Sequence, residues 1–440
     1  MSFPYVYLLR RPSYNYSKDG NDTYPDKHRG LLRYSPFQTA RITTPKCLFV
    51  FMEEDREHAN QLYLSLRNGI AKFPGCKQLT GLSLEVDNVR AVKVSEKDER
   101  NHGRAFFDAI KNHLIKNSKK PNFAFVLYSR HPKPHVQDPY CWAKAALTEH
   151  GIPSQFVSWE LLDSPNQFRY AVSNIALSFF VKLGGIPWSI SLERKAPSLV
   201  IGIGRAETED TASSKRHRLV GYAICTLSNG IYLDTSFFPP AETHSQFLEH
   251  LKEGLRETLD KMLSSYREVE KVTIHVTRME RRDTISAVRD TIRSYEQSSQ
   301  TPIPFELVRL SEDSDFYVFD LSHRGYVSEE GTIVALGQDH ALIVTEGRRE
   351  KAVWHGRKPV TLEMHRHYTS SPTLQIRDTI EDAFYLSSVN WRGFNVITQP
   401  ISLQYAKLLA QQVAKMSQVE PDICTYIQEN KEFNSVPWFI

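Results

Sequence analysis

The first half of the chain alternates short apolar runs with longer amphipathic stretches. The short runs are rich in β-branched and aromatic residues, as in buried strands, and occupy residues 46–52, 88–95 and 123–129. Residues 54–73 and 103–117, which lie between them, have the three- and four-residue apolar spacing of helices. Strands and helices that alternate in this way predict a parallel sheet covered by helices on both faces.

The second half of the chain has a different order. The predicted elements are strands at 199–204, 219–227 and 231–238, a helix at 243–266, a strand at 271–277 and a helix at 283–297. A Ser-Asn-Gly turn joins the second and third strands as a hairpin. Strand-like runs follow between 302 and 375, and helical patterns close the chain. We therefore expect two regions with a boundary just before residue 196. The first 40 residues read as an extended arm with little helix.

Polar residues gather on two predicted helices in the middle of the chain. Asp138 is a good N-cap for a helix over 139–150, and Tyr140 and Lys144 share one face of its first turns. A helix N-terminus with a hydroxyl and an ammonium beside it is typical of an anion site, and a phosphate is the expected guest. Ligands of parallel sheets bind beyond the carboxyl ends of the strands, so we expect the pocket there.

The second of these helices, predicted over 167–183, is mostly apolar and therefore buried. Asn174, Ser178 and Lys182 recur every four residues and form one polar stripe along it. A buried lysine is costly without an anionic partner, whereas a lysine at a helix C-terminus is also favoured by the helix dipole. The spacing alone leaves both interpretations open, an anion ligand and a solvated helix end.

The chain resembles the Argonaute family in several places. Four residues in order match that family's pocket for the 5′-phosphate of a guide strand, in the MID domain: Tyr140, Lys144, Gln155 and Lys182. The runs at 388–395 and 399–410 resemble the end of a PIWI domain, and the final VPWFI resembles the apolar tail that folds back into the MID pocket. In the family the terminal carboxylate, here that of Ile440, helps to hold a divalent cation against the phosphate. The resemblance therefore implies a Mg²⁺ ion there.

The resemblance also implies the fold class and the domains. It implies an α/β chain in which a Rossmann-like MID domain is followed by an RNase H-like PIWI domain, and the strand and helix order of the second half agrees with the latter. The implied boundaries are an N-terminal arm at 1–40, a MID domain at 41–195 and a PIWI domain at 196–440. Since 440 residues leave no room for separate N and PAZ domains, the chain looks like a short prokaryotic Argonaute.

An RNase H-like nuclease holds two divalent metals with a cluster of carboxylates. The positions at which the family carries these acids hold Gly204, Thr277 or Arg278, and Lys407 in this chain. None of these side chains can complete a two-metal site, so we expect a PIWI domain that does not cut and is not an enzyme. The alternatives are a guided nuclease with displaced carboxylates and a structural subunit of an effector complex.

The partners are likewise implied by the resemblance. They are a guide, RNA rather than DNA, a complementary single-stranded DNA target, and an effector protein with an APAZ domain of the TIR, sirtuin-like, nuclease or membrane class. Binding of the target would activate the effector in prokaryotic defence against plasmids or phage. Candidate contacts to the nucleic-acid backbone are Arg205, Arg278 and Arg392.

Composition adds little to this picture. A net charge of +4 is compatible with nucleic acid but does not establish it. Five scattered cysteines, no signal-peptide pattern and no apolar run of about 20 residues predict a cytoplasmic protein that does not insert into membranes. His365 and His367 have the spacing of a metal-binding pair, but without a third ligand nearby in the sequence we expect ordinary strand histidines.

Overall fold

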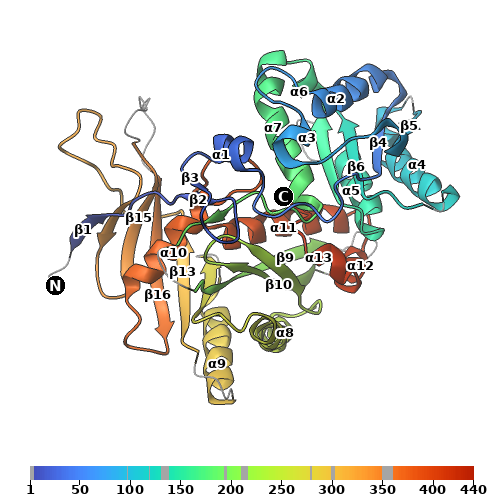
Figure 1. Ribbon diagram of the computed structural model, residues 1–440. Helices are drawn as coiled ribbons and strands as arrows, with labels where there is room; N and C mark the ends of the chain where they lie inside the picture. Colours follow the sequence, from blue (N-terminus) through green and yellow to red (C-terminus); the bar gives the residue numbers. More distant parts are fainter. Residues whose placement is uncertain are drawn as a thin grey trace.

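The computed structural model describes residues 4–96, 98–117, 119–129, 138–192, 196–209, 217–277, 280–298, 303–348 and 360–440. The chain is built on two sheets of different size, with a smaller sheet of three short strands between them (Figure 1). No helix within the described ranges is both long enough and apolar enough to cross a membrane.

The smaller of the two main sheets has four parallel strands. Their spatial order is β5 (Val89–Val94), β4 (Cys47–Met52), β6 (Phe123–Tyr128) and β7 (Ser154–Ser158). The surrounding helices are α2 (Arg56–Asn68), α3 (Cys76–Thr80), α4 (His102–Lys116), α5 (Pro139–Glu149), α6 (Trp159–Leu162) and α7 (Pro165–Lys182), with 3₁₀ turns at Glu53–Asp55, Val86–Asn88 and Glu99–Asn101.

Alternation along β4 explains why helices cover both faces of this sheet. Side chains of successive strand residues point to opposite faces. Phe49 and Phe51 therefore pack with α2 and α7, whereas Leu48 and Val50 pack with α4 and α5. This arrangement confirms the expected Rossmann-like layering. It also leaves β7 as an edge strand, so one side of β7 is free for other parts of the chain.

The larger sheet has nine strands. In spatial order they are β1 (Tyr5–Leu8), β14 (Thr332–Ala335), β15 (His340–Glu346), β16 (Val360–Thr369), β13 (Phe305–Ser311), β12 (Val272–Thr277), β9 (Leu199–Glu209), β10 (His217–Leu227) and β11 (Tyr232–Phe237). The three central strands β13, β12 and β9 run parallel, and the other pairs are antiparallel. This is the predicted RNase H-like fold.

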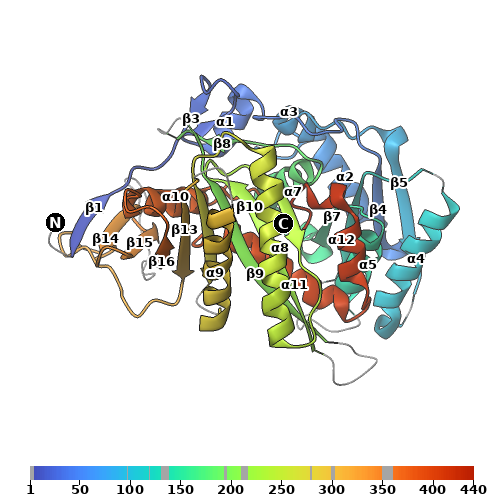
Figure 2. The same cartoon turned by 90° about the horizontal axis from the view of Figure 1, so that it is seen from below.

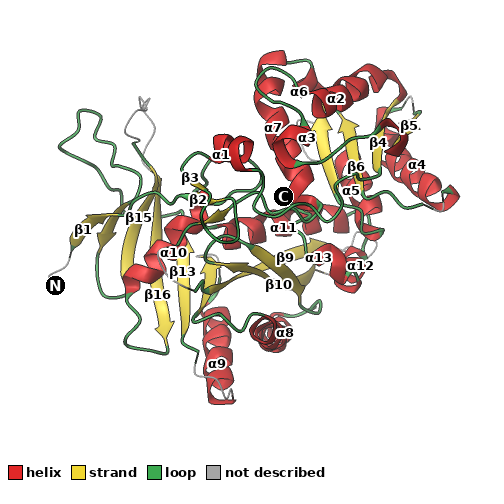
Figure 3. Cartoon of the chain, in the orientation of Figure 1, coloured by secondary structure: helices red, strands yellow, loops and turns green. Residues whose placement is uncertain are grey.

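Helices cover both faces of the larger sheet as well. On one face lie α8 (His244–Ser265) and α9 (Arg282–Ser298), which are side by side in Figure 2 and share an apolar core with β9 and β12. On the other face lie α10 (Ile376–Ser388) and α11 (Ile401–Ser417). Figure 3 shows that α11 runs between the two main sheets. It contacts both β9 of the larger sheet and α5 of the smaller sheet.

The N-terminal arm contains more regular structure than the sequence predicts. It includes β1, β2 (Tyr14–Asn15), β3 (Thr23–Tyr24) and the helix α1 (Lys27–Tyr34), and β2 also pairs with β8 (Ser189–Ile190). This short helix begins at Asp26, whose side chain caps α1 by accepting a hydrogen bond of 2.8 Å from the Arg29 amide. Since β1 pairs with β14, the arm begins at the edge of the larger sheet and then crosses the molecule (Figure 1).

The last residues of the chain are buried between the two main sheets (Figure 1 and Figure 2). After α12 (Ile423–Glu429) and α13 (Lys431–Asn434), the chain ends with Trp438 0%, Phe439 1% and Ile440 7% exposed. The Phe439 ring packs against Tyr405, with ring centroids 5.8 Å apart. These residues belong to one apolar cluster that includes side chains from both sheets.

Candidate anion-binding site

The first turn of α5 places Tyr140 beside the edge strand β7. The Asp138 carboxylate accepts a hydrogen bond of 2.9 Å from the Tyr140 amide and so fixes the start of the helix. The Tyr140 ring packs on Phe156, with centroids 4.5 Å apart. Burial, and then the neighbouring Tyr128, raise the pKa of Tyr140, so its hydroxyl is a neutral donor at physiological pH.

Lys144, one turn further along α5, is almost fully buried at 2% exposure. Its ammonium donates hydrogen bonds to the Ser154 hydroxyl at 3.2 Å and to the Trp438 carbonyl at 3.4 Å. Burial lowers the pKa of Lys144 to about 7. At neutral pH this side chain is therefore only partly protonated in the protein without a bound anion.

Lys182, the last residue of α7, reaches the same point from the other side. It is 3% exposed and donates to the Ser154 carbonyl at 2.9 Å and to the Gln155 side-chain oxygen at 3.0 Å. Burial, with added repulsion from Lys144 and Arg392, lowers the pKa of Lys182 well below its usual range. All four of these lysine hydrogen bonds go to uncharged oxygens, so in these bonds the charged forms of the two buried side chains have neutral partners. Such a pair is stabilised by an anion.

The remaining members of the predicted pocket lie along α7 and in the tail. Ser178 is 5% exposed and Asn174 is half-buried, and both share the face of α7 that ends at Lys182. Asn174 packs against Gly393, where an added Cβ would lie 2.9 Å from the Asn174 side-chain oxygen. The neighbouring Arg392 is exposed, and its positive charge acts to lower the pKa of Lys182 and of Tyr140. A residue predicted as a nucleic-acid contact thus lies beside the lysines.

The tail supplies one wall of the pocket. The Trp438 carbonyl accepts from Lys144, and the Trp438 ring lies 5.3 Å from that ammonium. The Gln412 amide of α11 donates to the Phe439 carbonyl, and Ile440 follows as a buried residue. The structure thus brings the C-terminal segment to the predicted pocket.

The position of the pocket in the sheet differs from the prediction. Tyr140 does lie beyond the carboxyl end of β6, but the two lysines meet at Ser154, the first residue of the edge strand β7. The reason is that α5 runs back along the sheet, so that a side chain one turn into the helix is displaced toward the amino ends of the strands. The free edge of β7 then leaves room for the tail.

A second cavity, of about 400 Å³, lies between β9, β12 and α11. Its lining includes Gly204, Thr277 and Lys407, which are among the positions at which the resemblance leads us to expect catalytic acids in the family. The Tyr222 ring fills the space beside Gly204, because a Cβ there would lie 2.5 Å from a ring carbon. The Tyr222 hydroxyl is fixed in turn by a hydrogen bond of 2.7 Å to the Ala406 carbonyl.

Four carboxylates also line this second cavity: Glu207, Glu280, Glu312 and Asp313. Burial raises the pKa of Glu280 and of Glu312, and Lys407 lies 3.8 Å from Glu312. Within the described ranges these acids do not form a trio with ligand atoms close enough to share a metal ion. Arg205 also lines the cavity, and its charge acts to lower the pKa of Glu280. Arg278, the other predicted nucleic-acid contact in this region, lies outside the described residues.

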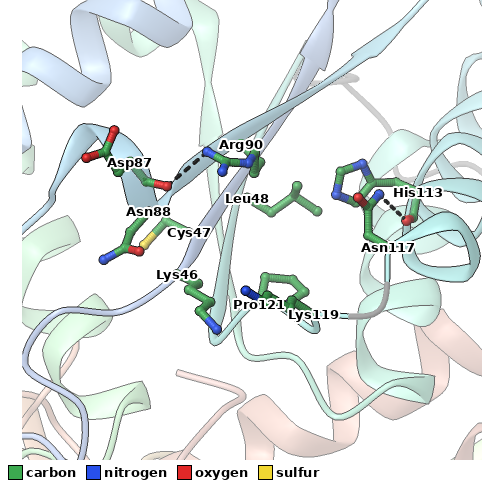
Figure 4. A pocket seen from close by; sticks show the side chains of 10 residues that line it. All are labelled: Lys46, Cys47, Leu48, Asp87, Asn88, Arg90, His113, Asn117, Lys119 and Pro121. Atoms are coloured by element: carbon green, nitrogen blue, oxygen red, sulfur yellow. Dashed lines mark hydrogen bonds between the residues drawn. The ribbon is translucent and has the colours of Figure 1, made fainter.

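A third cavity, of about 310 Å³, lies at the amino ends of β4 and β5 (Figure 4). Its lining is rich in basic side chains, including Lys46, Arg90 and Lys119. Arg90 donates to the Asp87 carbonyl at 3.0 Å, as the figure shows. The sequence analysis did not predict this cavity, because its lining residues come from three separate stretches of the chain without a motif.

Comparison with known proteins shows the family to which this chain belongs. The Piwi domain family matches residues 124–418, about two thirds of the chain. The chain therefore belongs to the Piwi domain family, as its resemblance to Argonaute proteins predicts.

Two relatives are similar over nearly the whole chain. The protein argonaute of Cereibacter sphaeroides is 24% identical over 444 residues, which cover 94% of this chain and 56% of that protein. The Piwi protein of Archaeoglobus fulgidus is 23% identical over 433 residues, which cover 94% of this chain and 93% of that protein. The chain thus spans little more than half the length of the first relative.

Two solved structures share the fold. Clostridium butyricum Argonaute, bound to a guide DNA and a 19-mer target DNA, superposes with a TM-score of 0.68 at 18% identity, over 94% of this chain and 53% of that chain. Drosophila Piwi superposes with a TM-score of 0.68 at 14% identity, over 99% of this chain and 56% of that chain.

Proposed function

We propose that this chain binds the 5′-phosphate of a guide strand at the two buried lysines and uses that guide to recognise a complementary strand. The observation that carries the proposal is the pair Lys144 and Lys182, both buried and both bonded only to uncharged oxygens in the four hydrogen bonds described above. A phosphate dianion would neutralise them, and the Tyr140 hydroxyl could donate a further hydrogen bond to it.

We propose that the guide is RNA and that the target is single-stranded DNA. The structure of Clostridium butyricum Argonaute contains a guide DNA, so the experiment below must distinguish an RNA guide from a DNA guide. Specificity would come from base pairing, while arginines such as Arg392 hold the sugar-phosphate backbone.

We also propose that a divalent cation lies beside the guide phosphate. A terminal carboxylate at the buried Ile440 would repel a guide phosphate unless a cation lay between them. The carboxylate and the Ser178 hydroxyl are hard oxygen ligands of the kind that Mg²⁺ prefers. When bound, Mg²⁺ would offset the charge of the phosphate, and Ile440 and Ser178 would hold it.

We further propose that the chain does not cut the target. Gly204 offers no ligand, and the Tyr222 ring occupies the space into which a side chain at this position would project. The other two positions of the expected metal site in this cavity hold Thr277 and Lys407, which carry no carboxylate. The alternative is a nuclease that uses the acids displaced around the same cavity. Mg²⁺- or Mn²⁺-dependent cleavage at one fixed guide position would establish that alternative.

A chain that binds without cutting needs a partner to act on an invader. The proposed partner is an APAZ-domain effector, activated on target recognition in defence against plasmids or phage. An apolar surface supports a protein partner, since Phe319, Leu321 and Tyr326 are 55%, 83% and 56% exposed within one short segment. The structural-subunit alternative would also use such a surface but would need no guide.

The test is to purify the chain from its host and to treat the co-purified nucleic acid with phosphatase, RNase and DNase. Short 5′-phosphorylated RNA is the expected result. The double variant Lys144→Ala, Lys182→Ala should lose this nucleic acid, while Lys116→Ala, at an exposed lysine of α4, should retain it. A double variant that keeps its guide would refute the pocket. Absence of short nucleic acid from every preparation, with the partner still bound, would favour the structural subunit.

A further inference from the structure

Two histidines and a glutamate meet on the larger sheet, on the neighbouring strands β15 and β16. His340 of β15 lies directly opposite His365 of β16 in the antiparallel register. Glu363 is two residues from His365, and side chains two apart on a strand share one face of the sheet. The backbone pairing therefore holds all three side chains on one face.

The three side chains converge on one point. The Nε2 atoms of His340 and His365 lie 3.0 Å and 2.9 Å from the same Glu363 oxygen, Oε1. The two imidazole rings are stacked, with centroids 3.8 Å apart. One ligand atom from each residue lies within 4.8 Å of the others, and this is the one such trio within the described ranges of the chain. The side chains are 25%, 28% and 13% exposed, so the site is sheltered but open to ions.

The chemistry of the trio fits a transition metal. Zinc sites with two histidines and one glutamate keep a fourth position open for water, and ligand atoms that share a tetrahedral zinc lie about 3.3 Å apart. Metal ions bind the unprotonated nitrogen of a histidine ring and an ionised carboxylate, and here one nitrogen of each ring already points at the same Glu363 oxygen. Ser314 forms a further hydrogen bond with Glu363 from outside the trio.

We propose that His340, Glu363 and His365 bind one divalent transition-metal ion of the zinc class. The ion would replace the two hydrogen bonds to Glu363 and would link β15 to β16. Its fourth position would face solvent and could take water or an anionic ligand. This site is independent of the lysine pocket, since it uses no residue of α5, α7 or the tail.

One neighbouring charge sets the expected strength of binding. Arg309 of β13 lies opposite His365 in the register, and its charge lowers the pKa of His365. A fixed positive charge beside the site repels a dication. We therefore expect Arg309→Ala to bind the metal more tightly than the wild type.

The experiment titrates the full chain, stripped with EDTA, with Co²⁺ by visible absorption and with Zn²⁺ by calorimetry. The expected result is one ion in a tetrahedral site, with binding weakened at least tenfold by His340→Ala, His365→Ala and Glu363→Gln. His367→Ala is the matched control, because it lies on the same strand with its ring 6.4 Å from that of His365 and should bind normally.

Two results would overturn the proposal. One is a wild-type chain that takes up no ion with tetrahedral absorption. The other is equal binding by the wild type, His340→Ala and His365→Ala, which would place the ion elsewhere. Circular dichroism of each variant separates loss of the site from loss of the fold. Guide binding measured in parallel should be unchanged, so that failure of the metal site leaves the lysine pocket untouched.

Discussion

Replacement of Lys144 by methionine should stabilise the guide-free protein and weaken guide binding at the same time. The two effects have one cause, which is the cost of keeping an ammonium buried among uncharged oxygens. Lys144→Met keeps most of the side-chain volume and removes the charge. If Lys144 served only to hold the fold together, Lys144→Met would instead destabilise the guide-free protein.

The size of the stability effect follows from the pKa. A fall from 10.5 to about 7 corresponds to about 5 kcal/mol of unfavourable burial for the charged form. The variant leaves the Ser154 hydroxyl and the Trp438 carbonyl without this donor, which costs about 1–3 kcal/mol for each. With about 2 kcal/mol for each of the two acceptors, we expect a net gain of about 1 kcal/mol in the free energy of unfolding.

The size of the binding effect follows from the bond that is lost. A hydrogen bond between an ammonium and a phosphate contributes about 1.5–3 kcal/mol, so the dissociation constant of a 5′-phosphorylated guide should rise about 10- to 100-fold. A 5′-hydroxyl guide lacks the dianion and should bind the variant and the wild type alike.

The assays are denaturant unfolding of the guide-free protein and fluorescence anisotropy with the two guides. Lys116→Met, at an exposed lysine of α4, is the control and should change neither quantity. If Lys144→Met destabilised the guide-free chain by about 3 kcal/mol, the lysine would be part of the scaffold. If it preserved the preference for a 5′-phosphate, the proposed pocket would be refuted.

Three further predictions concern other parts of the chain. The free energy of unfolding of the guide-free protein should rise between pH 7 and pH 9. The pKa of Lys144 is about 7 in the folded protein and 10.5 in the unfolded chain, so the unfolded chain binds more protons in this range. Denaturation at several pH values should show a smaller rise for Lys144→Met. Gly204→Asp should lower stability by about 1–3 kcal/mol in thermal unfolding, since its Cβ would contact Tyr222, whereas a neutral result would mean that the ring moves freely. Glu306→Gln should cost about 3–5 kcal/mol, because the buried Glu306 pairs with Lys271 at 3.1 Å; denaturant unfolding measures this, and a cost below 1 kcal/mol would contradict it.

The elements with local signals could be predicted from the sequence. The helix that carries Tyr140 and Lys144 begins where Asp138 caps it and ends one residue before the predicted end, because the cap and the following glycine are local features. The arm helix α1 was missed, since eight residues with a central glycine give a weak apolar pattern. In the structure Gly30 is required by the Tyr16 ring, which approaches too closely to allow a side chain.

The contacts that build the candidate sites join residues far apart in the sequence, and no spacing rule reveals them. Lys144 meets the carbonyl of Trp438, which lies 294 residues later. His340 lies 25 residues before His365, and only the pairing of β15 with β16 brings them together. The resemblance to a family predicted the residues of the first candidate site. The second was not predicted, because the sequence analysis weighed only His365 and His367 and expected ordinary strand histidines, whereas the structure places His365 beside His340 and Glu363.

The burial of Trp438 also bears on the order in which the protein can be completed during translation. The small sheet and both lysines have left the ribosome long before the tail is made, so Lys144 must wait for one of its hydrogen-bond partners. A nascent or truncated chain that lacks the tail would expose apolar surface from the cluster that joins both sheets. The surroundings of Lys144 are therefore complete only after the segment around Trp438 has folded onto the sheet. Quality control by chaperones and proteases would act on a chain in which that segment is missing.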